Sequence, residues 1–424
     1  MYLNNRGMTR YEYFITFFIV FVALCFRIDI INKRIACIVG FGLLALDIMV
    51  KLSNRNVSIQ FYSTDLFWLI HFLLFVFHRD PNYPLQYSMF FLLGWFSMFL
   101  LRNDIRNIKA VMDALLVFSF LNLLVNLVTI TAPNFYRNLT QLLFSNYSWN
   151  GNLAGLGGDA GRNAYYCIAG VAVIYSSLLA RTNKHRWFSW IEIIILVAIV
   201  FATGKLGHSL FVVATMLFVL LLTENSLTKR MRRLFVFMIV GAIIFAIIYE
   251  VFPEVQYLFT RALGKADISS GRFMLWDYAI RLFKDHPIFG IGYGSFSVNS
   301  LSITNYAVYV GIHNDYLQWL CEGGIVGLGV NLIISLGTFA LTVKEVKKLS
   351  SSQDESTGFH RMALIWSLFI QTFILLYSLT GIPHFSYEIN TVFYFACSVP
   401  FCLCNTGIFD KDVYRRYKGI SVRI

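Results

Sequence analysis

The chain has 424 residues, of which 57% are hydrophobic, 17% are aromatic and only 14% are charged, and its mean hydropathy is +0.63. Soluble domains carry about 25% charged residues, so this composition excludes an ordinary soluble protein and predicts an integral membrane protein. The formal net charge of +12 is then explained by cytoplasmic loops rich in Lys and Arg, and not by nucleic-acid binding.

Apolar stretches along the chain predict twelve membrane-spanning helices, because a span needs about 20 mostly apolar residues. The first stretch lacks a small-residue cleavage site, so we expect it to be a retained span and not a removed signal peptide. Two long gaps, 132–163 and 253–323, interrupt the series. The predicted spans are 11–26, 35–50, 59–77, 87–101, 110–131, 164–180, 187–203, 209–223, 234–252, 324–343, 362–382 and 387–404.

The distribution of charge predicts the orientation, since Lys and Arg concentrate in cytoplasmic loops. With the N-terminus in the cytoplasm, about two thirds of the 35 Lys and Arg residues lie on the cytoplasmic side. The first outer loop fits least well, because it holds Arg27, Lys33 and Arg34. We predict an all-α polytopic membrane protein of about 12 transmembrane helices, forming one domain over 1–424, with both termini cytoplasmic and both long gaps outside.

The outer loop 253–323 is expected to be structured. The stretch "RFMLWDYAIRLFKDHP" at 272–287 predicts an amphipathic helix, which Ser269 or Ser270 is placed to cap and Pro287 to end. Its broad apolar face predicts that this helix lies against the membrane or packs on other spans. The stretch "HNDYLQWLCEGG" then begins a second helix, which ends in a glycine pair.

Three basic groups fall on the predicted outer side, at membrane level or just above it. Lys205 lies in the tight turn "ATGKLGHS", Arg272 opens the first loop helix, and His313 opens the second. An arginine at a helix N-terminus adds its charge to backbone N–H groups that already suit an anion, which predicts phosphate binding. A neutral histidine nearby has the chemistry to take a proton from a hydroxyl near pH 7.

Each of these residues also has an ordinary structural interpretation. Taken alone, Lys205 is explained as a lysine whose side chain extends to the membrane interface. Arg272 is also explained as a solvated first-turn residue, and His313 as the residue that caps its helix. Histidine alone does not select the site, because three more histidines lie on the same predicted side, namely His208, His286 and His384.

Motifs for nucleotides and metals are missing or stand in the wrong context. The stretch "FGIGYGSF" at 289–296 contains GxGxG, but a helix and Pro287 precede it in place of a strand, so we reject a dinucleotide site and expect a tight turn. The outer loops contain no DxD pair, and the chain has no P-loop. Seven cysteines without a CxxC pair predict neither a zinc site nor a disulfide framework. We therefore predict no metal and no cofactor.

Three stretches, in order between Ala202 and Val330, resemble the O-antigen ligase and polymerase superfamily of bacterial membrane glycosyltransferases. They are the "TGK" turn, "SSGRFMLWDYAIRLFKDHPIFGIGYGSF" and "HNDYLQWLCEGGIVGLG". The run hPhhGhGhGSF followed by HNxhLxhhxExGhhG is the specific part, whereas the N-terminal half matches only in its pattern of spans. We take 202–330, which includes the loop 253–323, as the signature region.

The resemblance implies a transferase that moves a glycan from undecaprenyl diphosphate to an acceptor glycan, on the periplasmic or outer face of the bacterial inner membrane. It implies a catalytic role for His313 and donor-diphosphate binding by Arg272 and Lys205. The family usually carries arginine where this chain has Lys205, and lysine keeps the charge but loses the bidentate geometry. Neither a metal nor a nucleotide nor a nucleic acid is implied.

The sequence as a whole leaves three functions open. A polymerase passes the growing chain to the next repeat unit, and a ligase passes the finished polysaccharide to lipid A–core. The two share these motifs, so the motifs do not separate them. We predict a polymerase, with a ligase as the alternative. The implied partners are the lipid-linked donor, the glycan or lipid A–core acceptor, the bilayer and a chain-length regulator. The third function is a lipid-linked glycan flippase or another transporter, but carriers tend to show inverted repeats, and we find no such symmetry.

Overall fold

The parts of the chain that a computed structural model describes are α-helical, apart from short 3-10 turns and one two-stranded sheet. These parts are 10–25, 32–53, 58–102, 105–143, 153–224, 226–251, 271–303, 311–350, 358–404 and 420–423, together with the isolated positions 28, 256, 260 and 264.

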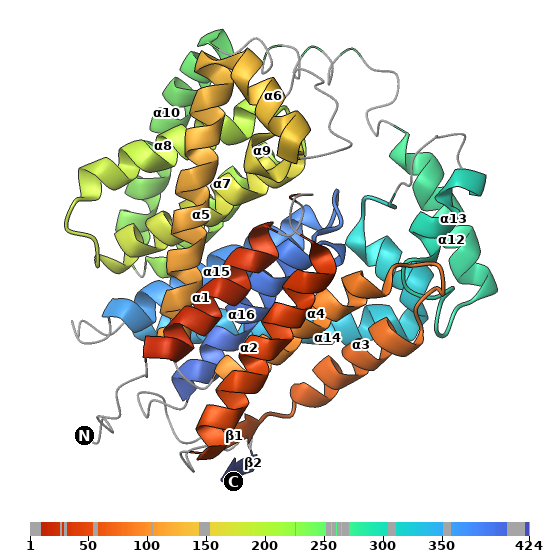
Figure 1. Cartoon of the computed structure of the whole chain (residues 1–424). Coiled ribbons are helices and arrows are strands. Elements are labelled where there is room, and N and C mark those ends of the chain that lie inside the picture. The colour runs from red at the N-terminus through yellow and green to blue at the C-terminus, as the bar shows by residue number, and fades with distance from the viewer. Residues whose placement is uncertain are drawn as a thin grey trace.

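Each of the twelve predicted spans overlaps a helix of the structure. The first helices are α1 (Arg10–Cys25), α2 (Lys33–Ser53), α3 (Asp65–Phe77), α4 (Leu85–Leu101), α5 (Ile105–Thr131) and α6 (Pro133–Leu143). They are followed by η1 (Gly155–Gly157), α7 (Ala160–Ala180), α8 (Arg186–Ala202), α9 (Leu206–Thr223) and α10 (Leu227–Val251). The last are α12 (Arg272–Asp285), α13 (Ser295–Ile303), α14 (Asp315–Ser350), α15 (Gly358–Tyr377), η3 (Pro383–Phe385) and α16 (Tyr387–Cys404). Figure 1 shows α12 and α13 together on one side of the molecule.

Five of the described helices are long and apolar enough to cross a membrane, namely α5, α7, α9, α14 and α15. Shorter apolar helices lie within α1, α3 and α4. A chain with several such helices is a multi-pass membrane protein. The number of twelve spans and the side on which each loop lies stay predictions.

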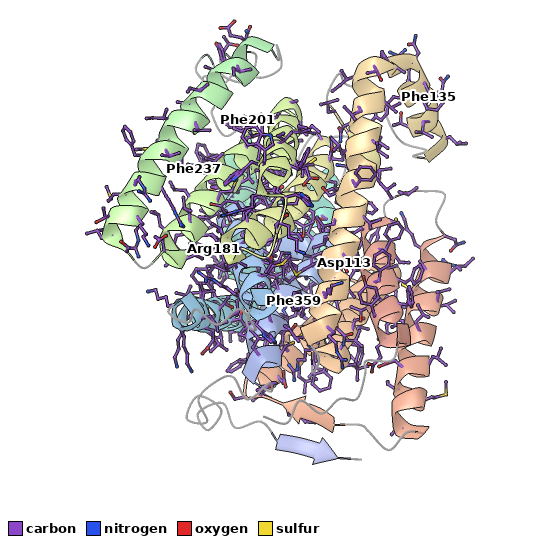
Figure 2. All side chains as sticks on the ribbon, turned by 90° about the vertical axis from the view of Figure 1, so that its left-hand side faces the viewer. Asp113, Phe135, Arg181, Phe201, Phe237 and Phe359 are labelled. Atoms are coloured by element: carbon purple, nitrogen blue, oxygen red, sulfur yellow. The ribbon has the colours of Figure 1, made fainter. Side chains whose placement is uncertain are left out.

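Helix α7 forms the centre of the buried core. Small residues such as Ala164 and Gly170 let α5, α8 and α15 pack closely on it, as small residues do between membrane helices. A Cβ at Gly170 would collide with Ser119 of α5. By contrast, α10, which carries Phe237 in Figure 2, lies at the edge of the molecule and keeps large apolar side chains such as Phe235 exposed. Such a face suits contact with lipid.

The predicted span 59–77 is wrong at its start. Ser58–Phe61 form strand β1, which pairs antiparallel with β2 (Ile420–Arg423), as Figure 2 shows at one end of the molecule. Helix α3 therefore begins only at Asp65. A buried bidentate ion pair fixes this start, because Arg102 donates to both Asp65 oxygens at 2.7 and 2.6 Å.

The predicted span 362–382 is too long at its end. Helix α15 stops at Tyr377, and residues 378–386, which we call the α15–α16 connection, lead to the next helix. The chain leaves the α-helix through tighter hydrogen bonds, from Leu379 N to Leu376 O at 3.2 Å and from Thr380 N to Tyr377 O at 2.9 Å. The connection lies next to the candidate site and supplies several of its hydrogen bonds.

Helix α14 is broken at Gly324, where the backbone has φ 62° and ψ −163°. Residues 287–292, which we call the inserted segment, fill the break with four backbone hydrogen bonds. Their donors and acceptors are Ile325 N to Pro287 O (2.9 Å), Val326 N to Ile288 O (3.2 Å), Ile291 N to Cys321 O (3.0 Å) and Gly292 N to Glu322 O (3.0 Å). The short helix predicted before the glycine pair is thus confirmed as the first part of α14.

The tight turn expected from the GxGxG motif is also confirmed. Gly290, Gly292 and Gly294 all have positive φ, a region that glycine enters at little cost. The Glu322 carboxylate holds the end of this turn by accepting the backbone N–H groups of Gly294 at 3.0 Å and Phe296 at 3.1 Å. The motif therefore docks the segment after α12 on α14.

Candidate active site

His313 immediately precedes Asn314 and α14, and it adopts φ 56°, a left-handed conformation that is uncommon outside glycine. Its neighbour caps the helix: Asn314 Oδ1 accepts the backbone N–H of Leu317 at 3.1 Å, and Asn314 O accepts that of Gln318 at 2.9 Å. The interpretation of His313 as a helix cap is therefore wrong. Its half-buried imidazole makes no hydrogen bond to the described residues, which leaves it available to a ligand.

Helix α12 lies over the start of α14 and joins Arg272 to the region of His313. Arg272 Nη1 donates to the Thr380 carbonyl at 3.0 Å, in the α15–α16 connection. One turn later on the same face, Trp276 Nε1 donates to the Ile312 carbonyl at 3.0 Å, directly before His313. These two hydrogen bonds attach the first turn of α12 to the α15–α16 connection and to the residue before His313.

The N-cap position of α12 differs from the predicted one. Gly271 occupies it with φ 85°, and no side chain caps the helix there. Ser269 and Ser270, the predicted caps, lie outside the described residues. The helix ends at Asp285, ahead of Pro287, as predicted.

Lys205 occupies the turn between α8 and α9, where its side chain is exposed. The start of α7 lies beside it, because Lys205 Cε is 4.0 Å from the position that a Cβ on Gly161 would take. Asp159 caps α7 by accepting the backbone N–H groups of Gly161 at 2.8 Å and Arg162 at 3.2 Å. This end of α7 thus adds an acidic and a basic group to the surroundings of Lys205.

The structure brings all three predicted site residues within electrostatic reach of one another. Burial, followed by the positive charges of Arg272 and Lys205, lowers the pKa of His313 to about 4, against a smaller opposite effect of Asp159. The imidazole is therefore neutral at pH 7 and can accept a proton. Burial alone would raise the pKa of Asp159, but Arg162, Lys205 and two backbone N–H groups lower it, so that carboxylate is ionised.

Sequence reasoning missed the charged start of α7. Arg162 Nε forms an ion pair with Glu388 Oε1 at 3.1 Å, and the Glu388 side chain is only 1% exposed. A signal was present in "GDAGRNA", where an aspartate and an arginine stand just before a predicted span. The partner in α16 follows 226 residues later, so no local pattern pointed to it.

The other three histidines on the predicted outer side differ from His313 in how far they are exposed. His208 is buried with its ring centroid 4.2 Å from that of Tyr377. His384 is buried and bonded to Asp315, with 2.7 Å between Nδ1 and Oδ2. His286 is exposed at the C-terminal end of α12. No group of three or more His, Cys, Asp or Glu side chains suited to a metal occurs in the described part of the chain.

Comparison with protein families gives one match in this region. The family model described as O-antigen ligase matches residues 190–332, which include Lys205, Arg272 and His313. This region is similar to the O-antigen ligase family. This match confirms the resemblance to the O-antigen ligase and polymerase superfamily. No curated protein is found to match the chain.

The matched residues cover most of α8, all of α9, α10, α12 and α13, and the first half of α14. Their partners in the site come from outside the matched region. Asp159 and Arg162 belong to the start of α7, and the α15–α16 connection follows the matched region in sequence. The candidate site is therefore formed by residues from inside and outside the matched region.

Proposed function

We propose that the protein is a membrane glycosyltransferase that moves a glycan from undecaprenyl diphosphate to an acceptor glycan on the periplasmic face of the bacterial inner membrane. The match of residues 190–332 to the O-antigen ligase family supports activity of this general type. The observation that carries the proposal is the setting of His313: a neutral imidazole without a hydrogen-bond partner in the described chain, close to the charges of Arg272 and Lys205.

The two cations are suited to the diphosphate of the donor. Arg272 stands at the first position of α12, where free backbone N–H groups favour an anion, and Lys205 is exposed and acts electrostatically on the same histidine. As the bond between the anomeric carbon and the diphosphate oxygen breaks, the lipid diphosphate leaves with the electron pair. Positive charge held at the leaving oxygens stabilises that transition state. Neither residue needs a metal ion for this role.

His313 is suited to the acceptor. The acceptor hydroxyl oxygen attacks the anomeric carbon while its proton passes to the imidazole, and direct displacement inverts the configuration at that carbon. Donor binding also strengthens this base. The negative diphosphate offsets the charges of Arg272 and Lys205, so the pKa of His313 rises from about 4 toward its ordinary value once the donor is bound.

Transfer by purified protein in detergent tests the proposal. The donor is the lipid-linked glycan extracted from cells that lack the protein, and the product is a new glycosidic bond. His313→Asn is expected to lower the rate by about 10²- to 10⁴-fold, and Arg272→Ala and Lys205→Ala to raise the KM for the donor. Arg281→Ala is the control, since Arg281 lies on the same helix in an exposed pair with Asp277.

Full transfer by the His313→Asn protein contradicts the proposed chemistry. A transporter predicts a different result, because flipping needs a sealed membrane and forms no bond. Bond formation in detergent therefore separates an enzyme from a flippase.

We infer a polymerase as the specific activity, with a ligase as the second candidate, which the description of the matched family favours. Deletion of the gene separates the two. Loss of a polymerase leaves single-repeat lipopolysaccharide or removes capsule, whereas loss of a ligase leaves finished glycan on undecaprenyl diphosphate. A chain-length regulator is an expected partner only of the polymerase.

A further inference from the structure

The carboxylate of Asp315 organises the α15–α16 connection. Asp315 Oδ2 accepts three hydrogen bonds, from Ser378 Oγ at 2.9 Å, from the backbone N–H of His384 at 3.1 Å and from His384 Nδ1 at 2.7 Å. The Asp315 backbone N–H donates in turn to the Ser378 carbonyl at 2.9 Å. Asp315 is 1% exposed and His384 is 6% exposed, so water does not compete for these bonds.

Burial of this carboxylate would be unfavourable in free energy without such hydrogen bonds. A buried charge is tolerated only where hydrogen bonds and favourable dipoles compensate for the lost water. Asp315 is the first residue of α14, where the positive end of the helix dipole favours an anion. The three donors to Oδ2 add to this, whereas Oδ1 is buried without a hydrogen bond to the described residues. These hydrogen bonds therefore attach the first turn of α14 to two points of the connection, Ser378 and His384.

The same connection contacts Arg272 and the helix that follows Lys205. Between Ser378 and His384, the Thr380 carbonyl accepts Arg272 Nη1, and the Leu379 carbonyl accepts Asn314 Nδ2 at 3.2 Å. Thr380 also reaches the first turn of α9, because its Oγ1 lies 2.9 Å from the position that a Cβ on Gly207 would take. The elements that carry Lys205, Arg272 and His313 thus all contact a stretch whose shape Asp315 fixes.

We propose that Asp315 is a positioning residue that sets Arg272 relative to His313 through the α15–α16 connection. Asp315 itself touches neither donor nor acceptor. It holds the backbone that presents the Thr380 carbonyl to Arg272, and it starts the helix that His313 precedes. This inference rests on the proposed function, because it assigns Asp315 a role in the geometry of that site.

A double-mutant cycle tests the role. Initial transfer rates are measured with purified full-length protein in lipid nanodiscs and lipid-linked glycan from cells that lack the protein. Asp315→Asn is expected to lower kcat/KM by about 10- to 100-fold in the otherwise unchanged protein. In an Arg272→Lys background the same change is expected to cost less than about threefold, because lysine no longer depends on the orientation of the Thr380 carbonyl.

Ser378→Ala is the milder second variant. It removes one of the three hydrogen bonds to Asp315 and is expected to show the same dependence on Arg272 with a smaller loss, so the test stands even if Asp315→Asn protein does not fold. Ser398→Ala is its matched control, since Ser398 is equally buried but bonds to Phe395 within its own helix. This control is expected to keep the full rate in both backgrounds.

The outcomes distinguish this inference from the proposed function. Equal losses from Asp315→Asn and from Ser378→Ala in both backgrounds would mean that they act only through general stability, which overturns the positioning role. If Arg272→Lys and His313→Asn proteins both transfer glycan at the full rate, the proposed site itself fails, whatever Asp315 does.

Discussion

Gly324 of α14 lies against Ile288 so closely that a Cβ at Gly324 would collide with the Ile288 carbonyl. Its φ of 62° and ψ of −163° lie in a region of backbone conformation that essentially only glycine occupies. Space and conformation therefore both require glycine at this position. The contact allows the inserted segment to reach the backbone of α14 on both sides of the break.

Replacement of this glycine is expected to unfold the joint between loop and helix. Gly324→Ala should lower the free energy of unfolding by about 3 kcal/mol or more, because strain and collision add. Gly329→Ala is the control on the same helix: nothing lies within 4 Å of a Cβ there, and alanine favours the helix by about 0.8–1.0 kcal/mol. Thermal unfolding of the purified proteins measures both. Equal melting temperatures for the two variants would contradict the prediction.

The left-handed backbone of His313 allows activity and stability to be separated. His313→Gly and His313→Asn remove the imidazole, but both residues accept φ 56° more readily than histidine does. We expect transfer to fall by about 10²- to 10⁴-fold while the melting temperature stays the same or rises. His313→Ala should lose both, because alanine in this conformation costs about 1 kcal/mol. A fall in stability that parallels the loss of activity in all three variants argues against a chemical role.

The pH dependence of transfer should report the charges around His313. The base must be neutral, so kcat/KM should fall as the pH drops through the His313 pKa of the free protein, about 4. The acid limb of kcat should lie at higher pH, because the bound diphosphate offsets the two cations and raises that pKa. Coincident limbs in the two profiles would exclude the coupling between donor and base.

Substitutions at Lys205 should move that limb in a defined direction. Lys205→Gln removes a positive charge that lowers the pKa of His313, so the acid limb of kcat/KM should shift to higher pH. Lys205→Arg keeps the charge and restores bidentate geometry, so the limb should stay in place and the KM for the donor should stay equal or fall. A limb that does not move in Lys205→Gln protein would place Lys205 outside the site.

The ion pair of Arg162 with Glu388 should be important for stability. Arg162→Met leaves Glu388 buried without its cation, and we expect a loss of about 3 kcal/mol. A second change, Glu388→Leu, should recover most of that loss, because no buried charge then remains. Arg281→Met removes the exposed pair with Asp277 and should cost at most about 0.5 kcal/mol. Chemical unfolding of the three variants compares them, and a Glu388→Leu change that adds to the loss would contradict the explanation.

The helices could be predicted because each apolar run marks one locally. The errors lie where distant residues decide the outcome. Strand β1 forms because Ser58–Phe61 meets Ile420–Arg423 from the other end of the chain, and no period in either segment shows this. The end of α15 was placed too late because the apolar pattern continues past Tyr377 and the first proline after it is Pro383.

The candidate site also contains residues that local motifs indicate and residues whose roles depend on distant parts of the chain. Arg272, His313 and Lys205 were found from motifs that lie within short stretches. The roles of Asp315 and Arg162 depend on partners that lie 69 and 226 residues away. A histidine next to an asparagine and an aspartate also left open which of them caps the helix, and only the hydrogen bond from Leu317 assigned that role to Asn314.

The inserted segment constrains how substrates can enter. It stands in for the missing turn of α14, so lifting it away would expose four backbone hydrogen bonds at once, each costing about 1–3 kcal/mol when its groups are left unpaired. We therefore expect residues 287–292 to stay in place during turnover. For the lipid-linked donor that we propose, we expect any gate to lie outside this segment.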